Sequence, residues 1–157
     1  MRVLIIDDDG DKRKALAEFV RELYPDAVNI EKASYQSGCE EALISAPDII
    51  LLDMTLPTYD VIPAEGETGG RHRPYGGRDV LRELSRRDMP SRVVIVTQYD
   101  MFSDGEDVNS LDDLKARLVS EFRSNYVATI FFQSSSSSWR SELAEAMAEA
   151  ILKNMEG

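Results

Sequence analysis

The sequence is poor in cysteine, histidine and long apolar runs. Because Cys39 is the only cysteine, an intramolecular disulfide and a zinc site built on several thiolates are both excluded. Because His72 is the only histidine, a relay or metal site built on several histidines is excluded as well. The apolar run at the N-terminus is too short for a signal peptide, and no run approaches a membrane span. We therefore expect a cytoplasmic protein without a membrane partner.

Basic residues are also scarce. Lysine and arginine number 18 against 29 aspartates and glutamates, which gives a formal net charge of −11. Such a chain repels phosphate backbones, so direct binding of nucleic acid is not expected. With 157 residues, 43% of them hydrophobic, the chain has the size and composition of one folded domain, and we assign residues 1–157 to it.

Short apolar runs rich in β-branched residues alternate with amphipathic stretches along the chain. This order predicts an α/β protein with a five-stranded parallel sheet and helices on both faces. The predicted strands cover 3–6, 27–33, 49–52, 93–96 and 126–132. The predicted helices begin after Asp11, at the capping-box spacing Ser37-Gly38-Cys39-Glu40, at Arg78, at Ser110-Leu111-Asp112-Asp113, and after the serine run 134–138.

Two segments carry no clear helix or strand pattern. The stretch 55–77 is rich in proline and glycine, so we predict a long irregular loop with an insertion at about 58–77. A connection of this length in a compact domain is usually functional or disordered. Residues 98–109 form a polar segment after the fourth strand.

Acidic residues gather where the predicted strands end. Asp7, Asp8 and Asp9 follow the first strand and Asp53 follows the third, while Thr97 ends the fourth. In an open parallel sheet, the carboxyl ends of neighbouring strands form the site, so these groups are expected to converge. Clustered carboxylates need a cation or shared protons, and magnesium is the natural candidate. A simpler interpretation is that the first acids only cap the helix that follows.

Three segments together resemble one family. Leu4-Ile5-Ile6-Asp7-Asp8, Leu51-Leu52-Asp53-Met54-Thr55-Leu56-Pro57 and Val93-Val94-Ile95-Val96-Thr97 resemble the motifs of response-regulator receiver domains of two-component signalling, and the resemblance covers nearly the whole chain. It implies a doubly wound, flavodoxin-like sheet with strand order 2-1-3-4-5. It also implies that Asp53 accepts a phosphoryl group from a histidine kinase, a phosphotransfer protein or a small donor.

The resemblance further implies the roles of the site residues. Asp8 and Asp53 would bind magnesium directly, the backbone carbonyl of Thr55 would be a third ligand, and Asp7 would contribute through water. Thr97 would then turn inward to bond the new phosphoryl group. Such a protein has at most self-phosphorylation and self-dephosphorylation activity. It signals through a downstream protein partner, and receivers often form homodimers through the fourth helix, fifth strand and fifth helix.

Three features depart from the family pattern. Receivers usually place a lysine at the end of the fifth strand, where this chain has Phe132 followed by Gln133. The residue after the switch hydroxyl is usually small and here is Gln98, which could contact the phosphoryl group or obstruct it. The long loop carries Arg71 and Arg73, either of which could replace the missing cation.

Two other functions stay open at this point. The missing lysine and Gln98 also suit a degenerate receiver that binds its partner without phosphorylation. The run Asp7-Asp8-Asp9-Gly10 also resembles the start of haloacid-dehalogenase-like phosphatases, in which Asp7 would be the nucleophile and Asp9 the general acid. That second family leaves Asp53 without a role.

Overall fold

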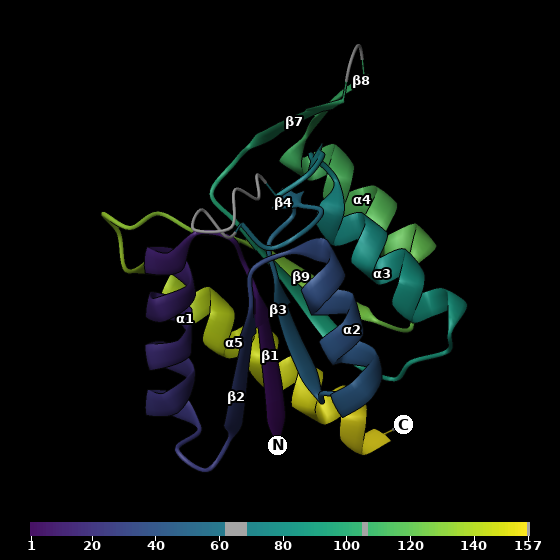
Figure 1. The fold of residues 1–157 in the computed structure, drawn as a ribbon. Coiled ribbons are helices and arrows are strands. Elements are labelled where there is room, and N and C mark those ends of the chain that lie inside the picture. The colour runs from purple at the N-terminus through teal and green to yellow at the C-terminus, as the bar shows by residue number, and fades with distance from the viewer. Residues whose placement is uncertain (62–68, 105–106, 157) are drawn as a thin grey trace.

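The computed structural model describes residues 1–61, 69–104 and 107–156. Its centre is a five-stranded parallel sheet with the strand order β2-β1-β3-β6-β9 (Figure 1). The predicted order 2-1-3-4-5 of the five sheet strands is therefore confirmed. The strands are β1 (Arg2–Ile6), β2 (Val28–Lys32), β3 (Ile49–Leu52), β6 (Arg92–Thr97) and β9 (Tyr126–Phe131).

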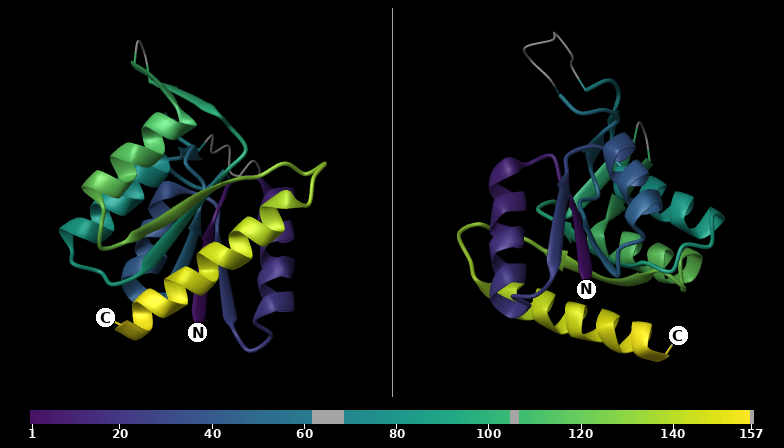
Figure 2. Two further views of the ribbon diagram at one scale, coloured as in Figure 1. Left: turned by 180° about the vertical axis from the view of Figure 1, so that it is seen from behind. Right: turned by 60° about the horizontal axis from the view of Figure 1, so that its bottom comes forward.

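Helices cover both faces of this sheet (Figure 2). On one face lie α1 (Gly10–Leu23) and α5 (Ser138–Glu156), and on the other lie α2 (Tyr35–Ser45), α3 (Gly76–Arg86) and α4 (Leu111–Glu121). Successive strand residues point to opposite faces, so Val3 and Ile5 pack with α1 and α5, whereas Leu4 and Ile6 pack with the other three helices. Two buried faces explain why the central strand β3 is apolar throughout.

The register of the strands places their carboxyl ends at one edge of the sheet. Ile6 pairs with Leu52, and Leu52 pairs with Ile95 on the next strand. The residues that follow β1 and β3 are therefore neighbours in space. This is the arrangement that we expected for the acids after the first and third predicted strands.

Helix α2 begins earlier than predicted. It starts at Tyr35 with Ser34 as its N-cap, and the Ser34 hydroxyl accepts a hydrogen bond from the Ser37 backbone N–H at 3.1 Å. The capping-box assignment at Ser37 was therefore wrong by one turn. An equally good cap three residues upstream takes its place, because Ser34 has the extended backbone that a cap requires.

The stretch 55–77, predicted to be an irregular loop, and the polar segment after the fourth predicted strand each contain a short antiparallel strand pair. In the stretch 55–77, β4 (Leu56–Pro57) pairs with β5 (His72–Arg73), while residues 62–68 of the insertion lie outside the described residues. The polar segment after β6 contains β7 (Met101–Asp104) and β8 (Asp107–Ser110). The Tyr75 hydroxyl donates to the Phe102 carbonyl at 3.3 Å, and the Tyr75 and Phe102 rings lie 6.3 Å apart, so this hairpin is fixed to the start of α3.

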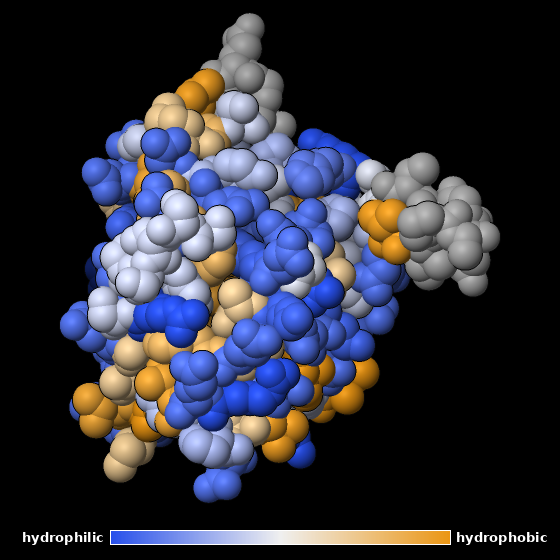
Figure 3. Space-filling model, turned by 90° about the vertical axis from the view of Figure 1, so that its left-hand side faces the viewer, coloured by the Kyte–Doolittle hydropathy of each residue, from blue (hydrophilic) through white to orange (hydrophobic). Residues whose placement is uncertain are grey.

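The face on the α1 side is mostly hydrophilic, with hydrophobic residues gathered toward its lower end (Figure 3). Among the described residues, no helix is long and apolar enough to span a bilayer.

Helix α4 offers a test of local sequence reasoning. The predicted N-cap Ser110 accepts a hydrogen bond from the Asp113 backbone N–H at 3.2 Å, which confirms that start. Replacing Ser110 with alanine is expected to lower the free energy of unfolding by about 1 kcal/mol, because one orphan N–H loses its partner. Urea unfolding would measure this loss. Ser120→Ala, at an exposed position near the end of the same helix, serves as the control and should change little.

Candidate functional site

Three carboxylates meet at the carboxyl edge of the sheet. Asp7 and Asp8 follow β1, Asp53 follows β3, and one oxygen of each lies within 4.8 Å of the others. The Asp53 backbone N–H donates to the Ile6 carbonyl at 2.9 Å, which continues the pairing of the two strands up to the site. Asp7 is 1% exposed and Asp53 is 3% exposed, whereas Asp8 faces solvent. The convergence of these acids that the sequence predicted is therefore present.

A lysine that sequence reasoning did not select lies inside this cluster. The Lys12 ammonium nitrogen, Nζ, is 2.8 Å from Asp7 Oδ2 and 3.3 Å from Asp53 Oδ1, and it donates to the Val96 carbonyl at 2.6 Å. Its side chain is 1% exposed. The burial of Lys12 could have been predicted from helical spacing. Lys12 precedes the buried Leu16 by four residues, so both lie on the inward face of α1.

Burial controls the electrostatics of the site. Desolvation raises the pKa of the Asp53 carboxyl to about 7, the neighbouring Asp7 and Asp8 charges raise it as well, and the Lys12 charge opposes the rise. Desolvation also raises the pKa of Asp7, again against the attraction of Lys12. One lysine thus only partly compensates three clustered acids, and a further cation would stabilise the ionised cluster.

The donor set fits magnesium. This ion takes oxygen ligands, binds through one or two carboxylates and keeps several waters, which suits two buried carboxylates beside an exposed one. Asp53 and Asp8 would hold it, with Asp7 close by. Thr55 lies two residues after Asp53, and its hydroxyl donates to the Pro74 carbonyl at 3.2 Å. This hydrogen bond involves the Thr55 side chain and not the backbone carbonyl, which is the group that the resemblance implies as a metal ligand.

Two polar residues, Thr97 and Gln98, mark the carboxyl end of β6, the strand next to β3 in the sheet. Thr97 ends β6 and is fully buried, and its hydroxyl accepts a hydrogen bond from the Tyr99 backbone N–H at 3.2 Å. Gln98 is exposed, and its amide donates to Asp9 Oδ2 at 3.5 Å. Asp9 also caps α1 by accepting from the N–H groups of Asp11 and Lys12. This cap assigns Asp9 a structural role, which differs from the general acid of a dehalogenase-like phosphatase.

The other cation candidates from the sequence have different surroundings. The Arg73 guanidinium lies 3.2 Å from Asp79, donates to the Thr58 hydroxyl and lies over the Tyr35 ring. Arg71 is exposed and directly precedes β5. Gln133 is exposed just after β9. Within the described residues, the ion pair to Asp53 comes from Lys12 and from none of these.

The lone cysteine and histidine add no chemistry to the site. Burial raises the pKa of the Cys39 thiol to about 11, so it is protonated at neutral pH and is a poor nucleophile. His72 is exposed on β5 and lines a cavity of about 510 Å³ that also includes Asp8 and Arg13.

A second cavity, of about 610 Å³, lies on the other side of α1 and is lined by Lys12, Gln98, Phe132 and the serine run. Lys12 therefore contacts Asp53 and also lines this second cavity, although its side chain is almost fully buried.

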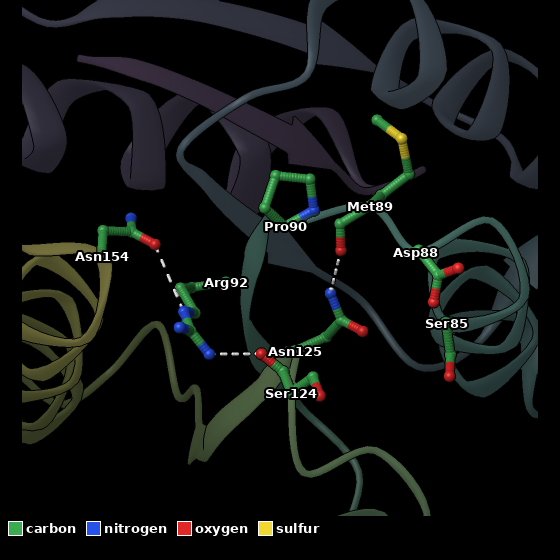
Figure 4. A pocket seen from close by; sticks show the side chains of 8 residues that line it. All are labelled: Ser85, Asp88, Met89, Pro90, Arg92, Ser124, Asn125 and Asn154. Carbon is green, nitrogen blue, oxygen red and sulfur yellow. Dashed lines mark hydrogen bonds between the residues drawn. The ribbon is translucent and has the colours of Figure 1, made fainter. Parts of the chain in front are cut away.

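A further cavity, of about 380 Å³, has a structural explanation (Figure 4). Three of its polar side chains, those of Arg92, Asn125 and Asn154, bind neighbouring groups of the chain. Arg92 donates to Asn154 at 3.2 Å and to the Ser124 carbonyl, and Asn125 donates to the Met89 carbonyl at 2.7 Å. These bonds tie the start of β6 and β9 to the end of α5 and leave the acid cluster as the main candidate site.

Comparisons with known proteins bear on the fold of the chain. No family model matches the chain. It is 28% identical over 149 residues to the uncharacterized protein y4jR of Sinorhizobium fredii, covering 93% of this chain and 96% of that protein. It is 25% identical over 150 residues to the Detocs response regulatory protein DtcB of Enterobacter cloacae, covering 95% and 99%. The signal receiver domain of a LuxO repressor protein from Vibrio parahaemolyticus superposes with a TM-score of 0.65 at 19% identity, covering 98% and 95%.

Proposed function

We propose that this chain, which has the fold of a response-regulator receiver domain, is a magnesium-dependent phosphoacceptor that is modified on Asp53. One observation carries the proposal: Asp53 is buried between two further carboxylates and a lysine at the carboxyl edge of the sheet. A fold needs no such cluster, because buried like charges raise one another's pKa and cost free energy. The similarity to a response regulatory protein along almost the full chain supports the same function.

The reaction is a transfer of one phosphoryl group. A carboxylate oxygen of Asp53 attacks the phosphorus of an acyl phosphate or a phosphohistidine, the new P–O bond forms, and the old bond breaks as the donor keeps its electron pair. Asp8 and Asp53 would hold magnesium, whose positive charge would offset the negative charge of the phosphoryl oxygens. The Met54 backbone N–H donates to Asp53 Oδ1 at 2.9 Å and orients the carboxylate. Natural donors would be a histidine kinase or a phosphotransfer protein.

The signal leaves the site through β6. Thr97 is the buried hydroxyl at the end of this strand, and turning it toward a phosphoryl group breaks its bond to the Tyr99 N–H. That change moves the segment between β6 and α4. The surface of α4, β9 and α5 is the proposed contact face for a downstream protein or for a second copy of the chain, and Val119 on α4 is an exposed apolar residue of that face.

Intact-mass analysis tests the phosphoacceptor. After incubation with Mg²⁺ and acetyl phosphate, the protein is expected to gain the mass of one phosphoryl group, and Asp53→Asn is expected to gain none. The conservative Asp8→Asn variant should be labelled at least about tenfold more slowly, since one carboxylate ligand of the metal is lost.

The absence of an adduct in a folded sample would contradict the proposal. It would favour the alternative of a receiver that binds its partner without phosphorylation. Labelling of Asp53→Asn to the same extent as the unchanged protein would also contradict it, because the acceptor would then lie elsewhere.

A further inference from the structure

We propose that Lys12, in the first turn of α1, is the cation that binds the phosphoryl group on Asp53. This inference rests on the proposed function above. It assigns to a helix a contact that the sequence resemblance places at the end of the fifth strand, where this chain has Phe132.

The contacts of Lys12 place its charge beside the acceptor. An ammonium group has three N–H donors, and Nζ lies close to three oxygens: Asp7 Oδ2, Asp53 Oδ1 and the Val96 carbonyl. The Val96 and Asp7 contacts, at 2.6 and 2.8 Å, are the shorter ones, and the Asp53 contact is the longest at 3.3 Å. The group is thus anchored on two sides while the third donor faces the carboxylate that would carry the phosphoryl group.

The position of Lys12 is costly for the fold alone. A buried ammonium loses its hydration, and a positive charge in the first turn of a helix opposes the helix dipole. Lys12 is nevertheless 1% exposed in that turn, with its charge opposite Asp7 and Asp53. Among the described residues, the opposite charge that compensates these costs comes from the acid cluster, and the Val96 carbonyl adds one hydrogen bond.

Other nearby cations are engaged elsewhere in the described part of the chain. Arg13, the next residue on α1, donates to the Asp7 backbone carbonyl and lies 3.2 Å from Glu31. Lys32 faces Glu41 at 3.9 Å. At the end of β9, Phe132 is 5% exposed, and its ring centroid is 6.0 Å from Lys12 Nζ. An apolar ring thus fills the strand end, and the Lys12 charge lies next to it.

Phosphorylation changes what this third donor meets. One Asp53 oxygen becomes the bridging oxygen of an acyl phosphate, and the phosphoryl group brings further anionic oxygens to the same place. The Lys12 N–H that faced Asp53 then binds a phosphoryl oxygen, and no proton is transferred. Because Lys12 also holds the carbonyl of Val96, which precedes Thr97 in β6, it connects the modified acceptor directly to the strand of the switch hydroxyl.

Lys12→Met tests the assignment, with Lys14→Met as the matched control on the exposed side of the same helix. Labelling of Lys12→Met by acetyl phosphate and Mg²⁺ is expected to be roughly 10- to 100-fold slower, as for loss of one hydrogen bond to a charged group. Its affinity for Mg²⁺ alone is expected to be unchanged or tighter, because the competing ammonium is gone. Lys14→Met should match the unchanged protein in both measurements.

The outcomes separate this inference from the function on which it rests. If the unchanged protein is labelled, Asp53→Asn is not, and Lys12→Met is labelled at the normal rate, the Lys12 assignment fails and the function stands. If the unchanged protein is not labelled, both fail. If Lys12→Met loses Mg²⁺ affinity in parallel with labelling, Lys12 only maintains the shape of the acid cluster, and the assignment fails.

A second measurement needs no variant. In the unchanged protein, the nitrogen-15 NMR signal of the Lys12 ammonium group is expected to shift when beryllofluoride, a phosphoryl mimic, is added to the Mg²⁺-loaded protein. The single tryptophan, Trp139, packs 4.9 Å from the Phe132 ring and provides a fluorescence reading of the same event. Binding of beryllofluoride, seen by fluorescence, without a shift of the Lys12 signal would overturn the assignment.

Discussion

Replacing Asp53 with asparagine is expected to stabilise the protein by about 2 kcal/mol at pH 7.5 in the absence of Mg²⁺. Burial raises the pKa of Asp53 from 3.8 to about 7, so at pH 7.5 the folded protein holds an unfavourable buried charge. A shift of one pKa unit corresponds to about 1.4 kcal/mol, which sets an upper limit near 4 kcal/mol. The variant also loses the attraction between Asp53 and Lys12, which reduces the gain.

The effect has a defined pH dependence. Because the folded pKa of Asp53 is higher than the unfolded pKa, the carboxyl contributes stability that is complete below about pH 4. That contribution is lost as the pH rises through about 7. The stability difference between Asp53→Asn and the unchanged protein should therefore be small at pH 4.5 and should grow toward pH 7.5. Urea unfolding across this range measures it.

Two controls define the outcome. The exposed Asp26→Asn variant removes the same charge far from the cluster and should change stability by less than about 0.5 kcal/mol. Added Mg²⁺ should stabilise the unchanged protein more than Asp53→Asn, because the ion binds the folded acid cluster. An Asp53→Asn protein that is no more stable than the unchanged one at pH 7.5 would show that Lys12 already compensates the buried charge.

Most of the fold was predictable because its signals are local and strong. The apolar runs at 3–6, 49–52 and 93–96 alternate with helical patterns, and a parallel sheet covered on both faces is the arrangement that such an order allows. The acids that follow two of these runs could be placed together for the same reason. Their convergence needs only that β1 and β3 pair, which they do.

The missed features depend on packing or on weaker signals. The pair Asp104-Gly105 is a hairpin signal in the sequence, but the flanking strands β7 and β8 are short and polar and are held by contacts with Tyr75. Lys12 was missed because a lysine in a helix is usually exposed. Its burial depends on its contacts with Asp7 and Asp53. These two acids follow different strands and are 46 residues apart in the sequence, so local patterns do not reveal the contact.

Replacing Gly77 with alanine is expected to be among the most damaging small changes in the chain. Gly77 is the second residue of α3, and its backbone N–H donates to the Met54 carbonyl at 2.8 Å. A Cβ atom there would lie 2.6 Å from the Asp53 carbonyl oxygen and 3.0 Å from the Met54 Cα. Both are backbone atoms, which cannot rotate away, so α3 or the Asp53 segment must move.

The expected result is a loss of about 2–3 kcal/mol in the free energy of unfolding, together with weaker Mg²⁺ binding. The two effects arise together because the atom that clashes belongs to the residue that would hold the metal. Gly10→Ala is the matched control, since its Cβ would meet only the Arg13 side chain, at 3.9 Å. Urea unfolding and Mg²⁺ titration of both variants measure the effects. If Gly77→Ala lost stability but bound Mg²⁺ normally, α3 would absorb the displacement and the position of Asp53 would not depend on it.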